Sequence, residues 1–213
     1  MKASVITMID SEKSRQVADR CIQSAARQGL TVSYFKAITP KDSPMKIASQ
    51  EQIPIEGFEE KYSRFENTLS AFLSHYWLWK MTAAGTTPHV IFEHDAVVVD
   101  RIPITLSGDI VNLGAPSYGK FNTPMTLGEG PLVSKPYFPG AHGYYVTPRA
   151  AQMLIDKAKT DACPTDIFIN KNNFTNVKEY YPWPVEAKDS FTTIQNETGC
   201  LAKHNYGETY EII

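Results

Sequence analysis

The chain is 213 residues long, and 42% of its residues are hydrophobic and 21% are charged. A length and composition of this kind are typical of one globular domain with a sizeable core, and they exclude a largely disordered chain. The formal net charge of -2 argues against broad, non-specific binding to nucleic acid or another polyanion.

The first part of the chain predicts a βαβ unit. Val5 to Ile9 is a β-branched run that is typical of a buried strand. A helix is expected next, because apolar residues follow Ala18 at i+3, i+4 and i+7 and Gly29 stands just after the helix end. Val32 to Ala37 then predicts a second strand. This spacing implies a parallel sheet with a right-handed crossover.

The next segments alternate between irregular and regular structure. Residues 39 to 60 contain several prolines and predict an irregular excursion. A long helix is expected from about Tyr62 to Ala84, with one apolar face and with Gly85 after its end. His89 to Phe92 predicts a third strand, and Asp109 to Leu113 predicts a fourth.

The second half begins with residues 114 to 140, which are rich in proline and glycine. We expect a mobile loop that orders when a ligand binds, since loops of this length are usually lids or binding loops. The alternative is a permanently ordered loop held by its prolines and aromatic side chains. Gly143 to Val146 predicts a strand, and Thr147 and Pro148 predict the start of a helix that ends near residue 159. No linker divides the chain, so we expect a single domain over residues 1–213.

A charged turn ends the third predicted strand. Glu93, His94 and Asp95 follow the apolar run directly. Charged groups at the end of a buried strand need partners, and ligands bind at the carboxyl ends of strands in an open α/β sheet. Two hard carboxylates one residue apart suit Mg²⁺ or Mn²⁺ held against a diphosphate. In the alternative interpretation, Glu93 and Asp95 only cap a turn or pair with Lys and Arg.

Other features bear on the compartment. Cys21, Cys163 and Cys200 form no CxxC pair, which favours reduced thiols. The apolar runs are too short for a transmembrane segment, and the first ten residues turn polar too soon for a secretory signal. The C-terminal residues carry no basic amphipathic stretch for a membrane surface. We therefore expect a cytoplasmic protein.

Several short segments follow one another in a specific order over about residues 3 to 195. They are Val5-Ile6-Thr7-Met8-Ile9-Asp10 with Arg15, Tyr34-Phe35-Lys36-Ala37-Ile38, Ala71-Phe72-Leu73-Ser74-His75-Tyr76-Trp77-Leu78-Trp79-Lys80, Val90-Ile91-Phe92-Glu93-His94-Asp95-Ala96, Gly140-Ala141-His142-Gly143-Tyr144-Tyr145-Val146 and Pro164-Thr165-Asp166. In this order they resemble glycosyltransferase family 25, the group of bacterial lipooligosaccharide galactosyltransferases and collagen galactosyltransferases. The family usually has Glu-Asp-Asp where this chain has Glu93-His94-Asp95, so the middle carboxylate is missing.

The resemblance implies an α/β, GT-A-like fold with a Rossmann-type, mostly parallel sheet. The nucleotide-binding half would cover about residues 1–113, and the acceptor-binding, catalytic half about residues 114–213. It also implies a nucleotide-sugar donor, usually UDP-linked, an acceptor hydroxyl, inversion at the anomeric carbon and Mn²⁺ or Mg²⁺ as cofactor. Ile9 and Arg15 would then contact the nucleotide, while Glu93 and Asp95 would form the metal site and Glu93 would also face the donor.

Four further residues have competing interpretations. His75 belongs to the implied nucleotide-sugar site, or it is a structural histidine that bridges helix and sheet. Asp166 is the candidate general base that takes the proton of the acceptor hydroxyl, or it is a helix N-cap. His142 is a candidate donor contact, and His204 is a candidate additional metal ligand. For both histidines, the alternative is a surface or core position without a role in the site.

The acceptor expected by default is a saccharide. A second enzyme hypothesis is a glycosyltransferase that acts on a hydroxymethylated base in DNA, which would be unstacked against the aromatic side chains of residues 174 to 183. A third hypothesis, from a different class, is a catalytically inactive module that binds a nucleotide sugar. The altered acidic turn suggests this last possibility.

Overall fold

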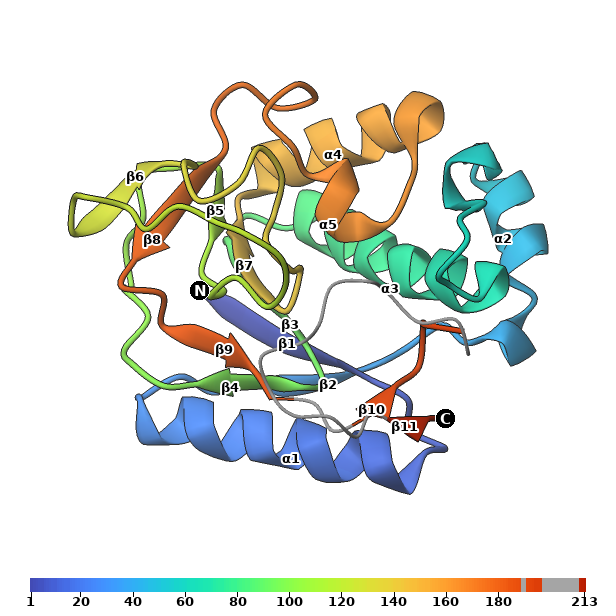
Figure 1. The fold of residues 1–213 in the computed structure, drawn as a ribbon, viewed down its shortest axis with the longest axis horizontal. Coiled ribbons are helices and arrows are strands. Elements are labelled where there is room, and N and C mark those ends of the chain that lie inside the picture. Colours follow the sequence, from blue (N-terminus) through green and yellow to red (C-terminus); the bar gives the residue numbers. More distant parts are fainter. Residues whose placement is uncertain (189–190, 197–210) are drawn as a thin grey trace.

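The computed structural model describes residues 1–188, 191–196 and 211–213. A seven-stranded sheet in the order β2-β1-β3-β7-β5-β8-β6 lies between α1 on one face and α3 and α4 on the other (Figure 1). The sheet strands are β1 (Lys2–Thr7), β2 (Ser33–Lys36), β3 (His89–Glu93), β5 (Ile110–Asn112), β6 (Gly128–Pro131), β7 (Gly143–Val146) and β8 (Lys178–Tyr181). The helices are α1 (Glu12–Arg27), α2 (Pro44–Gln50), α3 (Phe65–Ala83), α4 (Pro148–Asp161) and α5 (Thr165–Phe168).

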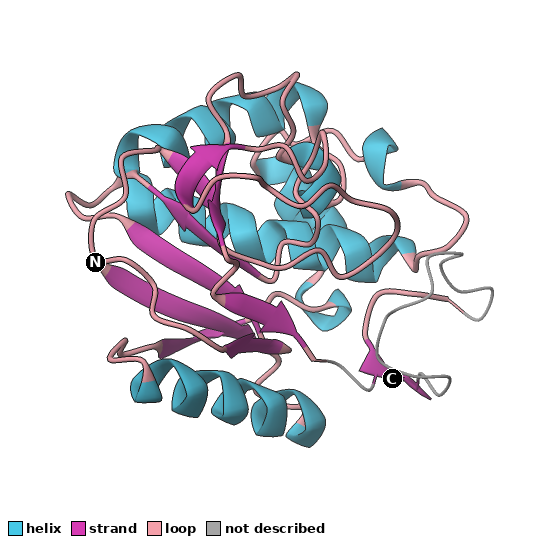
Figure 2. Cartoon of the chain, turned by 60° about the vertical axis from the view of Figure 1, so that its left-hand side comes forward, coloured by secondary structure: helices cyan, strands magenta, loops and turns pink. Residues whose placement is uncertain are grey.

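Two short strand pairs complete the described structure. β4 (Ala96–Val98) pairs with β9 (Val185–Ala187) in antiparallel fashion, close to α1. β10 (Phe191–Thr192) pairs with β11 (Glu211–Ile212) in parallel. Figure 2 shows the same layering from the side, with α1 separated from the other helices by the sheet.

The α/β class and the mostly parallel sheet are confirmed, and the arrangement is consistent with a GT-A-like fold. β1 pairs in parallel with β2 and with β3, and β5 pairs in parallel with β8. The sheet is nevertheless mixed, because β7 runs antiparallel to both β3 and β5 and β6 runs antiparallel to β8. β7 therefore begins at the edge where β3 ends.

Side chains along the central strands point alternately to the two faces of the sheet, so the hydrophobic core consists of two clusters. On β1, Val5 packs on the side of α1 with Ala18 and Cys21, while Ile6 belongs to the cluster on the other side with α3 and α4. This period of two is what a strand buried on both faces requires.

The expectation of an irregular excursion over residues 39 to 60 is wrong in part. α2 lies within this segment, and short 3₁₀ helices occupy Pro40–Asp42 and Glu56–Phe58. The prolines were interpreted as breakers, but Pro44 occupies the first helical turn, where the missing N–H costs nothing. Ala48 and Ile53 then anchor the segment in the core.

Residues 114 to 140 are also more regular than predicted. β6 lies in this segment and pairs with β8 at the edge of the sheet, where a proline is tolerated. Leu132 and Phe138 are fully buried in the core cluster beneath α3. These anchors agree with the alternative of an ordered loop held by its own side chains.

Candidate functional site

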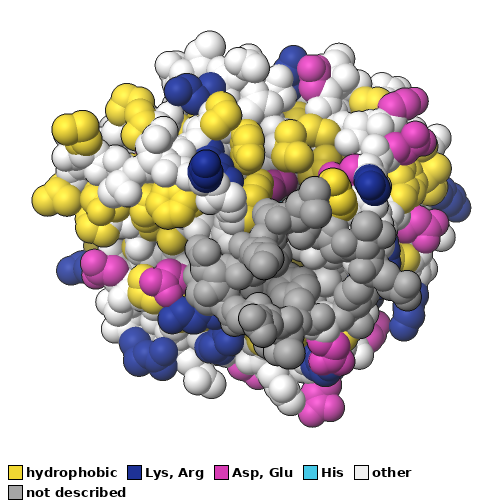
Figure 3. Space-filling model, viewed as in Figure 1, with side chains coloured by type: hydrophobic (Ala, Val, Ile, Leu, Met, Phe, Trp, Pro, Cys, Tyr) yellow, Lys and Arg dark blue, Asp and Glu magenta, His cyan; other side chains and the backbone are white. Residues whose placement is uncertain are grey.

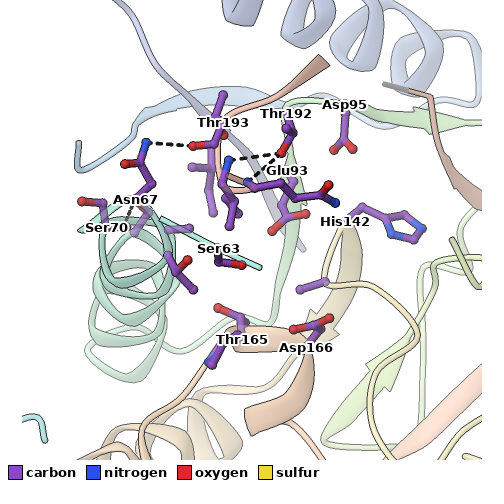
Figure 4. Close-up of a pocket in the computed structure, with 18 of the residues that line it drawn as sticks. Ser63, Asn67, Ser70, Glu93, Asp95, His142, Thr165, Asp166, Thr192 and Thr193 are labelled. Carbon is purple, nitrogen blue, oxygen red and sulfur yellow. Dashed lines mark hydrogen bonds between the residues drawn. The ribbon is translucent and has the colours of Figure 1, made fainter. Parts of the chain in front are cut away.

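A cavity of about 350 Å³ opens at the edge where β1, β2 and β3 end. Because these strands are parallel, the residues that follow each of them meet at this edge. α3 forms one wall, and the segments that follow β3 and precede β7 form another (Figure 4). Ligands in open α/β sheets bind at this place, so we regard the cavity as the candidate active site.

Glu93 lies at the end of β3 and is held by a buried chain of hydrogen bonds. His75 Nε2 lies 3.2 Å from Glu93 Oε1, and His75 Nδ1 lies 2.9 Å from the hydroxyl of Tyr144. The indole N–H of Trp79 donates to the same hydroxyl at 2.8 Å. An ionised carboxylate only accepts, so His75 donates its Nε2 proton to Glu93. When the ring is neutral, Nδ1 is then an acceptor for the Tyr144 O–H, whose oxygen accepts from Trp79.

The charge of Glu93 follows from these contacts. Burial raises the pKa of this carboxyl, but the hydrogen bond from His75 and the charges of His75, His142 and His94 lower it more, so the pKa lies below its ordinary value. Its side chain keeps 31% of its surface exposed, toward the cavity. Glu93 is therefore an ionised carboxylate that is held in one orientation and open to a ligand.

The resemblance assigned His75 to the nucleotide-sugar site, and its contacts also fit a histidine that bridges helix and sheet. The side chain is 1% exposed, and it links α3 to β3 and β7 through Glu93 and Tyr144. His75 nevertheless lines the cavity. The structure thus gives it a positioning role toward Glu93, and direct contact with a donor stays a prediction.

Asp166 faces the same cavity from the opposite side. Figure 4 shows its carboxylate and that of Glu93 turned toward one space. The hydroxyl of Tyr118 donates to Asp166 Oδ2 at 2.6 Å, and the backbone N–H of Ile167 donates to Oδ1 at 2.9 Å. The N-cap interpretation of Asp166 is wrong, because α5 begins at Thr165 and Pro164 holds the cap position.

The environments of Asp166 and Glu93 shift the pKa values of the two carboxyls in opposite directions. Burial raises the pKa of Asp166, the bond from Tyr118 lowers it, and the negative charge of Glu93 raises it again. The result is a pKa above the ordinary value. The two carboxylates in one cavity therefore differ in basicity, and Asp166 is the better proton acceptor.

Asp95 and His94 complete the charged turn. Asp95 lines the cavity, and its backbone carbonyl accepts hydrogen bonds from the N–H of Lys188 at 3.0 Å and from the guanidinium of Arg20 at 3.3 Å. His94 Nδ1 lies 2.7 Å from the hydroxyl of Ser14 in α1, and its ring packs edge-on against Phe191. His94 thus fixes the turn to α1.

The donor set of this turn fits a hard divalent cation that shares its ligands with a substrate. Glu93 and Asp95 both line the cavity and offer carboxylate oxygens. Within residues 1–188, 191–196 and 211–213, no group of three or more His, Cys, Asp and Glu side chains is arranged as a metal site. Mg²⁺ is commonly held by one or two carboxylates together with substrate phosphates and water, so two protein ligands are compatible with such an ion.

His142 is enclosed by glycines. Its side chain is 2% exposed. A Cβ atom at Gly114 would lie 2.4 Å from His142 Nε2, and one at Gly140 would lie 2.6 Å from Nδ1. Figure 4 shows the ring directed away from the carboxylates. His142 lines the cavity and is a core residue, and its contact with a donor stays a prediction.

The remaining predicted residues lie elsewhere. Ile9 and Arg15 are not among the described residues that line the cavity, although Met8 is. The guanidinium of Arg15 instead donates to the carbonyl of Ile9. Their contact with a nucleotide stays a prediction. His204 lies outside the described residues.

Sequence reasoning missed several residues that shape the site. Tyr118 stands in a segment that was expected to be a loop, and nothing in the spacing connects it with Asp166, 48 residues later. On α3, Asn67, Ser70 and Ser74 turn small polar side chains toward the cavity. Their i, i+3 and i+7 spacing places them on one helix face, and this pattern was detectable in the sequence. A helix face that packs in an apolar core usually carries larger, apolar residues.

No family model and no curated protein matches the sequence. Membership of glycosyltransferase family 25 is therefore not supported. Among solved structures, the chain is similar to a glycosyltransferase involved in the glycosylation of the major capsid of PBCV-1. The sequence identity is 11%, the TM-score is 0.37, and the match covers 75% of this chain and 68% of that chain. No helix in the described part of the chain is long and apolar enough to cross a membrane.

Proposed function

We propose that the chain is an inverting glycosyltransferase that moves a sugar from a nucleotide-diphosphate donor of the UDP type to an acceptor hydroxyl, with a saccharide as the default acceptor. The observation that carries the proposal is the pair Glu93 and Asp166. These carboxylates face one cavity, and their environments shift the two pKa values in opposite directions. Such a divergence is typical of sites where two carboxylates have different chemical tasks.

Asp166 is assigned as the general base. In the reaction, the acceptor oxygen forms a bond to the anomeric carbon on the face opposite the leaving group, and the bond from that carbon to the diphosphate oxygen breaks. The nucleoside diphosphate leaves with the electron pair, and the proton of the acceptor hydroxyl passes to Asp166. A raised pKa suits this role, because a stronger base accepts the proton of the acceptor hydroxyl more readily.

Glu93 and Asp95 are assigned to the donor side, where they would hold Mn²⁺ or Mg²⁺. When bound, such an ion neutralises charge that develops on the diphosphate leaving group. His75 contributes by holding the Glu93 carboxylate in one orientation through its Nε2 proton. Ligand orientation of this kind commonly affects metal affinity by about 10- to 100-fold.

Among the described residues Cys21 and Cys163 are free thiols, which supports a reducing, cytoplasmic location for this activity. Among the described residues that line the cavity, none favours a DNA base over a saccharide. The inactive-module alternative is weakened by Asp166, because a module that only binds a nucleotide sugar has no use for a base with a raised pKa.

The test combines binding and turnover. Purified protein is incubated with a panel of nucleotide sugars, with and without Mn²⁺, and thermal stability is recorded, since a ligand that binds only the folded state raises the melting temperature. Donors that stabilise the protein are then assayed for release of nucleoside diphosphate, with the Asp166→Asn variant as control. Donor binding with no release above that of Asp166→Asn, even with mixed saccharide acceptors, would assign the chain to the inactive module.

A further inference from the structure

An apolar ridge projects from the β6 edge of the sheet. It consists of Phe121, Met125, Leu127 and Val133, whose exposed fractions are 42%, 100%, 78% and 44%. Single exposed apolar residues are ordinary, but several large ones within one short segment mark an interaction site. In Figure 3 hydrophobic side chains gather at the upper left, where Figure 1 places β6 and the loops that flank it.

Aromatic side chains support the ridge from below. The ring of Phe121 packs edge-on against Trp183 at 5.9 Å, and Trp183 packs edge-on against Tyr181 at 5.0 Å. The indole N–H of Trp183 donates to Glu179 Oε2 at 3.0 Å. The ridge therefore stands on a fixed aromatic base, and its exposed tips are backed by packed side chains.

A hollow beside the ridge carries charges of one sign. It is lined by Lys120, Lys135 and Lys171, together with Phe121 and Val133, and no carboxylate of the described residues lines it. Lys120 and Lys171 are exposed, while Lys135 lies deeper, with its ammonium 3.9 Å from the centre of the Tyr118 ring. The acidic residue of the segment, Glu129, is turned inward, where its carboxylate binds Lys178 and Ser107.

We propose that the ridge and the lysine-lined hollow dock the protein onto an anionic lipid surface. The exposed apolar tips would enter the boundary between head groups and acyl chains, and the exposed Lys120 and Lys171 would bind lipid phosphates. Apolar insertion combined with attraction of Lys to anionic head groups is the usual basis of interfacial membrane binding. Aromatic side chains such as those of Tyr181 and Trp183 suit this boundary, because one end is apolar and the other is polar.

The lysines also argue against a second copy of the chain and against an apolar protein partner as the binding partner of this surface. In a symmetric dimer through this surface, Lys120 and Lys171 of one copy would meet the same lysines of the other, with no exposed carboxylate of this segment to pair with them. An apolar protein partner would not call for the hollow with its three lysines.

The position of the surface connects it with the candidate active site. Tyr118, which binds Asp166, directly precedes the segment that carries the hollow and the ridge. Docking would thus place the Asp166 side of the cavity next to the membrane. If the proposed transferase function holds, the acceptor hydroxyl belongs to a molecule anchored in that membrane. Docking itself does not depend on the proposed function.

The test is co-sedimentation of the full chain with vesicles of phosphatidylcholine alone and of phosphatidylcholine mixed with phosphatidylglycerol. We expect binding to the anionic vesicles. Met125→Gln combined with Leu127→Gln should reduce the partition coefficient by at least about tenfold, because both apolar side chains would no longer be transferred from water. These residues are largely exposed, so the fold should be unaffected. The matched control is Met81→Gln with Met153→Gln, which changes two exposed methionines on α3 and α4.

A second pair of substitutions tests the charge. Lys120→Gln with Lys171→Gln should remove most of the preference for anionic over neutral vesicles while leaving thermal stability unchanged. Equal binding of the parent and the Met125/Leu127 variant, or no binding to either kind of vesicle, would overturn the proposal. A dimer in light scattering that the Met125/Leu127 variant abolishes, without vesicle binding by the parent, would assign the surface to a second copy instead. Measurement of nucleoside diphosphate release with a soluble acceptor is independent of all these outcomes.

Discussion

Replacing Tyr144 with phenylalanine removes one oxygen atom from the buried chain that connects Trp79 with Glu93. The indole N–H of Trp79 and Nδ1 of His75 both lose their partner in a fully enclosed place. A buried polar group without a hydrogen bond costs about 1–3 kcal/mol. Two such groups predict a loss of about 2–6 kcal/mol in the free energy of unfolding. For a domain of this size, that lowers the melting temperature by at least roughly 4 °C.

The same substitution should act on the site. Without the Tyr144 hydroxyl, His75 loses the partner that holds Nδ1, so the ring that donates to Glu93 is less well fixed. We expect Mn²⁺-dependent donor binding to weaken by about 10- to 100-fold, as is usual when a group that orients a metal ligand is removed. Calorimetry measures both effects, as the melting temperature and as the dissociation constant of the donor.

The matched control is Tyr34→Phe, which removes a phenol hydroxyl from a tyrosine that is 46% exposed. Its bond to Asp19 lies at the surface, so stability should change by less than about 0.5 kcal/mol. If Tyr144→Phe and Tyr34→Phe melt within one degree of each other, the buried chain of hydrogen bonds does not contribute as described.

Three further predictions concern separate groups. Asp166→Asn should lower turnover by about 10² to 10⁴ while donor affinity stays near the parental value, and rapid-quench and binding measurements separate the two quantities. Parental turnover would leave Asp166 with no role as base. Asp95→Asn should abolish the Mn²⁺-dependent part of donor binding with an unchanged melting temperature, and a variant that binds donor and metal like the parent would place the metal elsewhere. Burial and the charge of Lys2 lower the pKa of His89 from 6.5 to about 4, so the folded state keeps this ring neutral while the unfolded chain takes up a proton. Stability should therefore fall as the pH drops from 6.5 toward 4, by about 3 kcal/mol, and urea unfolding of His89→Gln should show a correspondingly flatter pH dependence.

The ends of helices were predicted correctly where a single residue determines the local backbone conformation. Thr147 caps α4 and Pro148 occupies its first turn, as predicted. Gly29 has a positive φ of 81° directly after the C-cap of α1, which is the conformation that favours glycine at this position. The α2 region was missed because proline both ends and begins helices, and only tertiary burial distinguishes the two cases.

The site was predictable only in part. Glu93 and Asp95 stood out because charge at the end of an apolar strand is conspicuous, and both line the cavity. The partners that fix them were not visible, because Tyr144 and Trp79 are ordinary aromatic residues of buried elements. Their meeting depends on β7 running antiparallel to β3, which no local pattern specifies.

The packing of His142 between Gly114 and Gly140 makes three distant positions in the chain interdependent. Neither glycine has room for a methyl group while the imidazole is present, as distances of 2.4 and 2.6 Å to its ring nitrogens show. Among chains descended from a common ancestor, a side chain at position 114 should therefore be accompanied by a smaller residue at position 142. Substitution of one glycine alone by alanine should be poorly tolerated, and replacement of the histidine by a small residue should restore tolerance at position 114. At position 140 the positive φ of 137° would keep the preference for glycine even then.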